Sequence, residues 1–248
     1  MLKRLMADNS VKKACQILES SKKILVLTGA GISASAGIPT FRSTNGLWNN
    51  TDIQRFGSSE TWLEDPWSCW FAYEKFRKLV DSLEPTKAHQ AINQLSKILP
   101  LSIVTTNVDS LHKRSGTDAM EIHGTLRKLR CMSCGRQDEL LHLEDVSHPA
   151  CPACKNWRRH DVVLWNEEIK RFDEYSDLLE TSDCLVLVGL SGVVTRTREL
   201  SSRFRKRNAK VIEINPETYT PATLNTNVSV RLSADDALQR VEDSLKNS

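Results

Sequence analysis

The sequence lacks any apolar run of the roughly 18 residues that a membrane-spanning helix requires. Its basic start, MLKRLMADNS, also lacks the apolar core and small-residue cleavage site of a secretory signal. Charge of one sign does not dominate either, because the formal net charge is +3 and the pI is about 8.4. We therefore expect an intracellular, cytoplasmic protein without a membrane partner, and we do not expect nucleic acid as a partner. The nucleus or an organelle matrix is left open, and nothing predicts an oligomeric state.

The sequence also lacks the even number of cysteines typical of a disulfide framework, because it has seven. Four of them form two tight pairs, Cys131-x2-Cys134 and Cys151-x2-Cys154. Four thiolates close a tetrahedral zinc site and leave no coordination position for water. We therefore expect one structural zinc held by Cys131, Cys134, Cys151 and Cys154. The remaining three cysteines lie in helix or strand patterns, typical of small buried side chains.

Short apolar strands separated by helical patterns dominate the rest of the chain. The expected strands are 22–30, 101–106, 120–123, 184–189, 210–215 and 227–232, and the expected helices include 11–20, 59–83, 85–98 and 234–245. This alternation predicts an α/β fold, a Rossmann-like parallel sheet with helices on both faces. We expect residues 1–124 and 161–248 to form that Rossmann-like domain, and the polar segment 125–160 to form a zinc-ribbon insert.

A glycine turn follows the first expected strand, in the segment LTGAGISASAGIPTFRS (27–43). Gly29 and Gly31 would let the backbone approach a pyrophosphate at a helix N-terminus. The pattern is incomplete, because Ala34 stands where a dinucleotide fingerprint has its third glycine. Taken alone, the segment fits a turn without ligand equally well.

Polar side chains follow several of the other expected strands. Asn107 and Asp109 come after one strand, His123 ends another, and Ser191 and Asn215 follow two later ones. Ligands bind at the carboxyl ends of strands in open α/β sheets, and a histidine there can serve as a general base. Helix caps, turns and a structural histidine are the alternatives for each residue taken singly.

Together these motifs resemble the sirtuin (Sir2) family of NAD-dependent protein deacylases, from about Lys23 to about Leu238. GAGISASAGIPTFRS is similar to the family's GAGxSxxSGIPxFR, and TTNVDSLH to its TQNxDxLH. The His123-Gly124 pair, the two cysteine pairs, VV at 162–163, Glu167, GLSG and EINPE follow in family order.

The resemblance implies a protein-lysine deacylase (deacetylase) that transfers the acyl group to ADP-ribose, releases nicotinamide and consumes NAD as a co-substrate. The expected partners are proteins carrying acylated lysine. The implied catalytic residues are His123, as general base, and Asn107. The implied cofactor-binding residues are Gly29, Ala30, Gly31, Ser33, Thr40, Phe41, Arg42, Trp48, Thr106, Asn107, Val108, Asp109, Gly189, Leu190, Ser191, Asn215, Glu217 and Ala234.

The sequence departs from the family mainly on the substrate side. The glutamine of TQN is Thr106 here, so one ribose contact is shortened or lost. The family's FGE is Trp165-Asn166-Glu167, in the strand that normally pairs with substrate backbone. Tyr73 matches a tyrosine that reads acidic acyl groups in one branch, but the arginine three residues later is Phe76, so a preference for acidic acyl groups is not supported.

Two alternatives remain open at this point. A mono-ADP-ribosyltransferase or NAD glycohydrolase on the same scaffold would fit the altered 164–166 strand. A non-enzymatic module that binds NAD or DNA would use the basic stretch 195–210, although most such stretches are solvated helix faces.

Overall fold

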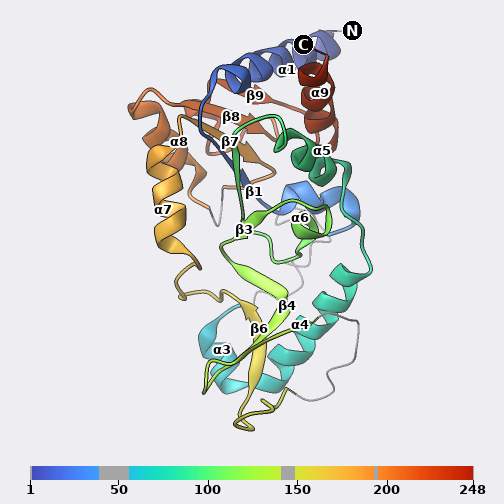
Figure 1. Cartoon of the computed structure of the whole chain (residues 1–248), viewed down its shortest axis with the longest axis vertical. Helices are drawn as coiled ribbons and strands as arrows, with labels where there is room; N and C mark the ends of the chain where they lie inside the picture. Colours follow the sequence, from blue (N-terminus) through green and yellow to red (C-terminus); the bar gives the residue numbers. More distant parts are fainter. Residues whose placement is uncertain (1, 39–55, 141–148, 193–194, 248) are drawn as a thin grey trace.

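The computed structural model describes residues 2–38, 56–140, 149–192 and 195–247. The molecule has a larger lobe built on a six-stranded sheet and a smaller lobe built on a three-stranded sheet (Figure 1). The larger sheet has the order β3-β2-β1-β7-β8-β9 and all its pairs are parallel. Its strands are β1 (Ile24–Thr28), β2 (Leu101–Thr105), β3 (Ala119–Glu121), β7 (Cys184–Val188), β8 (Lys210–Ile214) and β9 (Val228–Val230). The predicted Rossmann-like sheet is confirmed.

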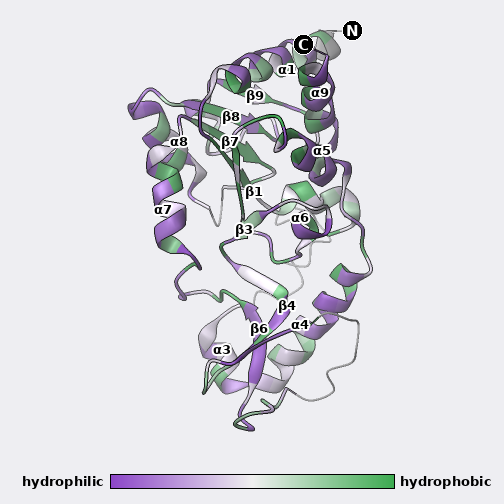
Figure 2. Ribbon diagram, in the orientation of Figure 1, coloured by the Kyte–Doolittle hydropathy of each residue, from purple (hydrophilic) through white to green (hydrophobic). Residues whose placement is uncertain are grey.

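The two central strands, β1 and β7, are apolar along almost their whole length. Their sequences, ILVLT and CLVLV, are buried at every position. A strand in the middle of a parallel sheet carries helices on both faces, so it needs apolar side chains on both (Figure 2). The strand order runs outward in opposite directions from β1 and β7, which makes the gap between them a topological switch point.

Helices cover both faces of the larger sheet. One core includes residues of α1 (Leu2–Ser20), α5 (Lys87–Leu95) and α9 (Ala234–Lys246). The other face is covered by α7 (Phe172–Thr181) and α8 (Thr197–Lys206), which pack around the fully buried Phe204. Within the described part of the chain, no helix has the length and apolar character needed to cross a membrane.

The smaller lobe combines an antiparallel sheet with two helices. Its strands are β4 (Gly124–Cys131), β5 (Gln137–Glu139) and β6 (Arg158–Val162), and its helices are α3 (Ser59–Glu64) and α4 (Pro66–Asp81). Side chains of α3 and α4 share one core with β4 and with Leu164. The expected helix 59–83 is interrupted because Asp65 caps α4, accepting a hydrogen bond from the Ser68 N–H, with Pro66 in the first turn.

Short elements complete the chain: η1 (Ala30–Ala36), α6 (Leu111–Arg114) and η2 (Thr223–Asn225). The segment after the glycine turn is therefore a 3-10 helix whose end is marked by Gly37 at φ 98°. The proposed division into 1–124 with 161–248 and 125–160 remains a prediction. The helices α3 and α4 share their core with β4 and β6, the strands on either side of the cysteine turns.

Candidate active site and metal centre

Two glycine turns meet at the switch point. The Gly29 N–H donates to the Val188 carbonyl at 3.0 Å, and the Gly31 N–H donates to the Gly189 carbonyl at 2.9 Å. A Cβ added to Gly31 would lie 2.6 Å from the Gly189 Cα, and one added to Gly29 would lie 2.5 Å from the Leu190 side chain. Glycine is therefore required at Gly31, where backbone meets backbone, whereas at Gly29 the nearest atom is the flexible end of the Leu190 side chain.

An open cleft with about 1110 Å³ of empty space lies over these turns. The structure brings ten of the predicted cofactor-binding residues to its lining: Gly29, Ala30, Gly31, Thr106, Gly189, Leu190, Ser191, Asn215, Glu217 and Ala234. They come from the ends of β1, β2, β7 and β8 and from the start of α9, as expected for the carboxyl edge of a parallel sheet. The mostly apolar lining, with a few polar groups at strand ends, suits a dinucleotide.

Asn107, Ser33 and Asp109 form a buried hydrogen-bond network beside the cleft. The Asn107 amide donates to the Gly29 carbonyl and to the Ser33 hydroxyl, both at 3.2 Å. The Ser33 hydroxyl donates to the Asp109 carboxylate at 2.7 Å. The same carboxylate also accepts a hydrogen bond from the Leu111 N–H. Burial raises the pKa of Asp109 above its ordinary value, against the effect of these hydrogen bonds. The network ties the end of β2 to the glycine turn, and Val108 is the residue between its members.

His123 lies between the two lobes, next to the end of β2. Its carbonyl accepts the Val163 N–H at 2.8 Å, so the residue is anchored to the segment that leaves β6. Burial lowers the pKa of the ring below its ordinary value, and a hydrogen bond to the backbone of Thr106 opposes that shift. The imidazole is therefore neutral at pH 7, the form that can accept a proton.

Four predicted cofactor-binding residues, Thr40, Phe41, Arg42 and Trp48, lie outside the described residues. The cleft also has lining residues that the sequence reasoning missed: Ile32, Ala34, Ser35, Gly192, Thr195, Pro216, Ser233 and Asp235. Ser233 had a readable signal, because a serine two residues before Asp235-Asp236 predicts a helix N-cap, and its hydroxyl does accept the Asp236 N–H. Helix N-termini and strand ends meet at this edge, so the cap of α9 belongs to the cleft.

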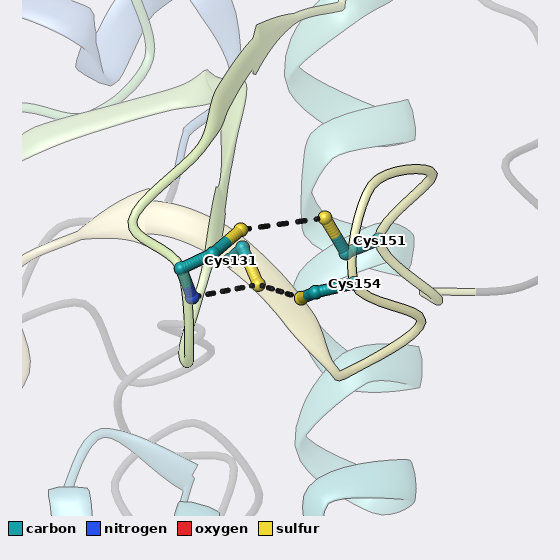
Figure 3. Close-up of side chains that lie close together, drawn as sticks. Cys131, Cys151 and Cys154 are labelled. Atoms are coloured by element: carbon teal, nitrogen blue, oxygen red, sulfur yellow. Dashed lines mark hydrogen bonds between the residues drawn. The ribbon is translucent and has the colours of Figure 1, made fainter.

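The four cysteines of the two pairs converge on one point. Their sulfurs all lie within 4.8 Å of one another, and two Sγ–Sγ distances are 3.4 Å (Cys131–Cys154) and 3.8 Å (Cys134–Cys151). Figure 3 shows the cysteine side chains turned toward one another from two separate turns. Four sulfurs at Zn–S bonds of about 2.3 Å would lie about 3.8 Å apart, so the cluster fits a tetrahedral zinc.

The two cysteine turns have matching backbones. Gly135 and Lys155, each directly after the second cysteine of its pair, have φ values of 72° and 64°. The Gly135 N–H donates to the Cys131 carbonyl and the Lys155 N–H to the Cys151 carbonyl. This repeated left-handed turn presents both pairs of sulfurs to the same side, which supports a single shared metal.

The altered motif Trp165-Asn166-Glu167 forms a tight turn at the edge of the smaller lobe. Asn166 has φ 71°, a left-handed conformation that glycine adopts freely and that asparagine tolerates better than most residues. The Glu167 carboxylate accepts a hydrogen bond from the Leu164 N–H at 2.9 Å. It also forms an ion pair with the buried Arg159. The turn therefore has a backbone that a glycine at position 166 would also adopt, while the indole of Trp165 stays exposed.

The fold and site together define a dinucleotide-binding α/β protein with a histidine base beside its cleft and a four-cysteine metal centre. The Sir2 family profile matches residues 29–196. Related proteins named NAD-dependent protein deacylase include one from Thermococcus kodakarensis, 35% identical over 82% of this chain and 84% of the relative. Another, from Aquifex aeolicus, is 34% identical over 90% of this chain and 95% of the relative. The chain belongs to the Sir2 family.

Solved structures agree with this assignment. A Sir2 homologue in complex with NAD superposes with a TM-score of 0.86 at 32% identity and covers 95% of this chain and 94% of its own. A Sir2 homologue in complex with ADP-ribose also has a TM-score of 0.86 at 32% identity, covering 96% of this chain and 98% of its own. The resemblance predicted from the sequence motifs is confirmed.

Proposed function

We propose that the chain removes acyl groups from lysine side chains of other proteins, consuming NAD. It is an NAD-dependent protein deacylase of the Sir2 type. The single observation that carries this function is the meeting, at one sheet edge, of a glycine-lined dinucleotide cleft and the half-buried His123. Relatives at 34–35% identity that carry the deacylase name support the same activity.

Different residues of the cleft suit different parts of the NAD molecule. The N–H groups around η1, beside Gly29 and Gly31, suit the pyrophosphate, because a helix N-terminus attracts an anion. Asn215 and the start of α9 lie at the far end of the cleft, where they suit the adenosine half. Asn107 and Asp109 suit the nicotinamide end, because their network is buried and directly follows Thr106 in the cleft lining.

His123 serves as the general base in this proposal. NAD supplies the ribose carbon that the acyl oxygen attacks, with release of nicotinamide. A neutral imidazole beside that ribose accepts a hydroxyl proton and so promotes transfer of the acyl group to ADP-ribose. The lowered pKa of His123 keeps the ring neutral at physiological pH.

The zinc proposed for the four cysteines is structural. Four sulfur ligands complete its coordination, so no position remains for a reacting water. Its contribution is to hold the two cysteine turns together at the end of the smaller lobe.

The alternative of ADP-ribosyl transfer or NAD hydrolysis without acyl transfer is not favoured, because the relatives named above are deacylases. An assay with NAD and an acetyl-lysine peptide separates the activities. We expect nicotinamide release that depends on the peptide and is matched by loss of its acetyl group. Nicotinamide release without peptide, or label from NAD ending on protein, would contradict the proposal.

A variant assigns the base. We expect His123→Ala to abolish acyl transfer while the melting temperature and NAD binding stay close to those of the unsubstituted protein. His160→Gln is a matched control, because it replaces another buried histidine, one that contacts Glu74 in the smaller lobe, without removing the proposed base. An undiminished rate in His123→Ala would show that the base is misassigned.

A further inference from the structure

We propose that Ser110 is a positioning residue for the proposed base, because its hydroxyl joins the residues on either side of His123 into one hydrogen-bonded chain. The inference rests on the proposed function, since it assigns a role to a neighbour of that base. Ser110 belongs neither to the cleft lining nor to the cofactor-binding residues that the family resemblance implies.

The hydroxyl of Ser110 makes two hydrogen bonds that bracket His123 in the sequence. It donates to the Glu121 carboxylate at 2.9 Å, and its oxygen lies 2.7 Å from the Thr125 hydroxyl oxygen. Glu121 is two residues before His123, and Thr125 is two residues after it. Ser110, Thr125 and the Glu121 side chain are all buried. One side chain therefore ties the end of β3 to the start of β4 across the turn that carries the proposed base.

The donors and acceptors give this chain a single direction. A hydroxyl has one hydrogen to donate, so Thr125 donates to the Ser110 oxygen while Ser110 donates to Glu121. The Thr125 oxygen accepts a hydrogen bond from the Arg127 N–H at 3.1 Å, and the Glu121 carboxylate pairs with Lys113. Each hydroxyl thus has both a donor and an acceptor, and the chain ends on a carboxylate. A fully satisfied buried chain of this kind favours one arrangement of the residues that it joins.

The backbone of Ser110 is strained. Its φ of 57° lies in the left-handed region that few residues other than glycine adopt. Such positions persist where the surrounding contacts determine them, and they gather at functional sites. The preceding residue, Asp109, bonds to Ser33 in the network beside the cleft, whereas Ser110 bonds to the strands that flank His123. Two adjacent residues therefore connect the cleft network with the proposed base.

The turn that carries His123 is also held from the smaller lobe. A Cβ on Gly124 would lie 1.9 Å from the Asp161 carbonyl oxygen, so the turn packs tightly against β6. The Val163 N–H holds the His123 carbonyl, and Ser110 adds a side-chain restraint from the segment after β2. A small displacement of a general base slows proton transfer without changing how the cofactor binds. Loss of the Ser110 hydroxyl should therefore lower kcat and leave the KM for NAD unchanged.

The test uses variants of the full chain, assayed with NAD and an acetyl-lysine peptide. Ser110→Gly removes the hydroxyl and relaxes the backbone, because glycine adopts φ 57° without strain. Thr125→Val removes the second hydroxyl with little change in shape, and Thr125→Ser restores it. Asn208→Gly is the matched control, since Asn208 has φ 63° and lies in an exposed turn between α8 and β8. The kcat, the KM for NAD and the melting temperature are measured for each variant.

We expect Ser110→Gly and Thr125→Val each to lower kcat about fivefold, the size expected for one lost hydrogen bond. Thr125→Ser should restore kcat, and Asn208→Gly should not change it. The double variant with Ser110→Gly and Thr125→Val should also be about fivefold slower, because residues that act in one chain are not additive. A double variant slower by the product of the two single losses would show that the hydroxyls act separately, and would overturn the proposal.

The same assay separates failure of this proposal from failure of the proposed function. Complete absence of peptide-dependent nicotinamide release in the unsubstituted protein would overturn the proposed function. Deacylation by the unsubstituted protein, with an undiminished kcat in Ser110→Gly, would overturn only the role of Ser110. A raised KM for NAD in place of the lowered kcat, or an equal loss of kcat in Asn208→Gly, would overturn that role as well.

Discussion

Gly31 and Gly189 pack backbone against backbone, with the Gly31 N–H donating to the Gly189 carbonyl at 2.9 Å. Each would place a Cβ 2.6 Å from the other's backbone, and Gly189 has φ 61°. This contact closes the floor of the cleft between β1 and β7. It also explains why Ala34 can replace the third glycine of a dinucleotide fingerprint. The closest backbone contact here joins the two glycine turns, and not a helix and the sheet.

We expect Gly31→Ala to weaken NAD binding at least tenfold, because the two turns must separate by several tenths of an ångström. The free energy of unfolding should fall by about 1 to 3 kcal/mol. Calorimetric titration with NAD and urea denaturation measure the two effects. Gly135→Asn is a suitable control, because that position has a left-handed backbone and open space around it, far from the cleft. Unchanged NAD affinity in Gly31→Ala would contradict this reading of the cleft floor.

The four-cysteine cluster predicts a metal-dependent fold of the smaller lobe. We expect Cys131→Ala to lose stoichiometric zinc and to melt earlier, because three sulfurs cannot close the site. Elemental analysis and thermal melting measure both effects. Cys15→Ala serves as control, since Cys15 is buried in the larger lobe and should leave one zinc per chain. Full zinc content in Cys131→Ala, with unchanged melting, would rule out the proposed ligand set.

The parallel sheet and the metal cluster were both predictable, for different physical reasons. Strands such as ILVLT and CLVLV are buried on both faces and so need no alternation to be recognised. The cysteine pairs were recognisable because the spacing within each pair identifies metal ligands whatever the conformation of the loop between the pairs. The packing of α4 against β4 and β6 was not predictable, because the aromatic residues of a helix do not indicate which sheet the helix packs against.

Two buried histidines make stability depend on pH. Burial lowers the pKa of His89 to about 4 and that of His112 to about 3. An unfolded chain protonates histidine near pH 6.5, so below that pH the unfolded state binds protons that the folded state does not. The stability that the two neutral rings contribute is complete above pH 6.5. It is lost as the pH falls toward the folded-state pKa values of about 4 and 3. We expect the free energy of unfolding to be about 3 kcal/mol lower at pH 5.5 than at pH 7.5.

Urea denaturation at both pH values measures this difference. His89→Gln should reduce it by about half, because one of the two titrating rings is gone. An identical difference in that variant would show that His89 titrates normally in the folded protein.

Asn166 predicts which replacements the substrate-side turn accepts. Its φ of 71° is available to glycine without strain, so Asn166→Gly should keep the melting temperature and deacylation rate within about twofold. Asn166→Val should cost about 1 to 2 kcal/mol, because a β-branched side chain strains a left-handed backbone. Thermal melting and the KM for an acetyl-lysine peptide are the measurements. Equal behaviour of the two variants would show that the turn has another conformation in solution.

Within the site, the sequence indicates a lining residue where that residue follows a strand, and gives no signal where the placement depends on the three-dimensional fold. Asn215 and Ser191 could be predicted because the strand before each is clear. Ile32 and Ser35 line the same cleft, but only the course of η1 places them there. The hydrogen bond from the Thr106 hydroxyl to the Thr28 carbonyl was equally hidden, since it depends on the distance between two strand ends.

The peptide units on either side of His123 are bonded to the chain that returns from the smaller lobe. The Val163 N–H donates to the His123 carbonyl and the Lys170 N–H to the Ile122 carbonyl, both at 2.8 Å. Any rotation of one lobe against the other therefore moves the imidazole together with the returning segment. A substitution that displaces the backbone of Val163 or Lys170 should therefore displace the proposed base as well, although neither residue belongs to the cleft lining.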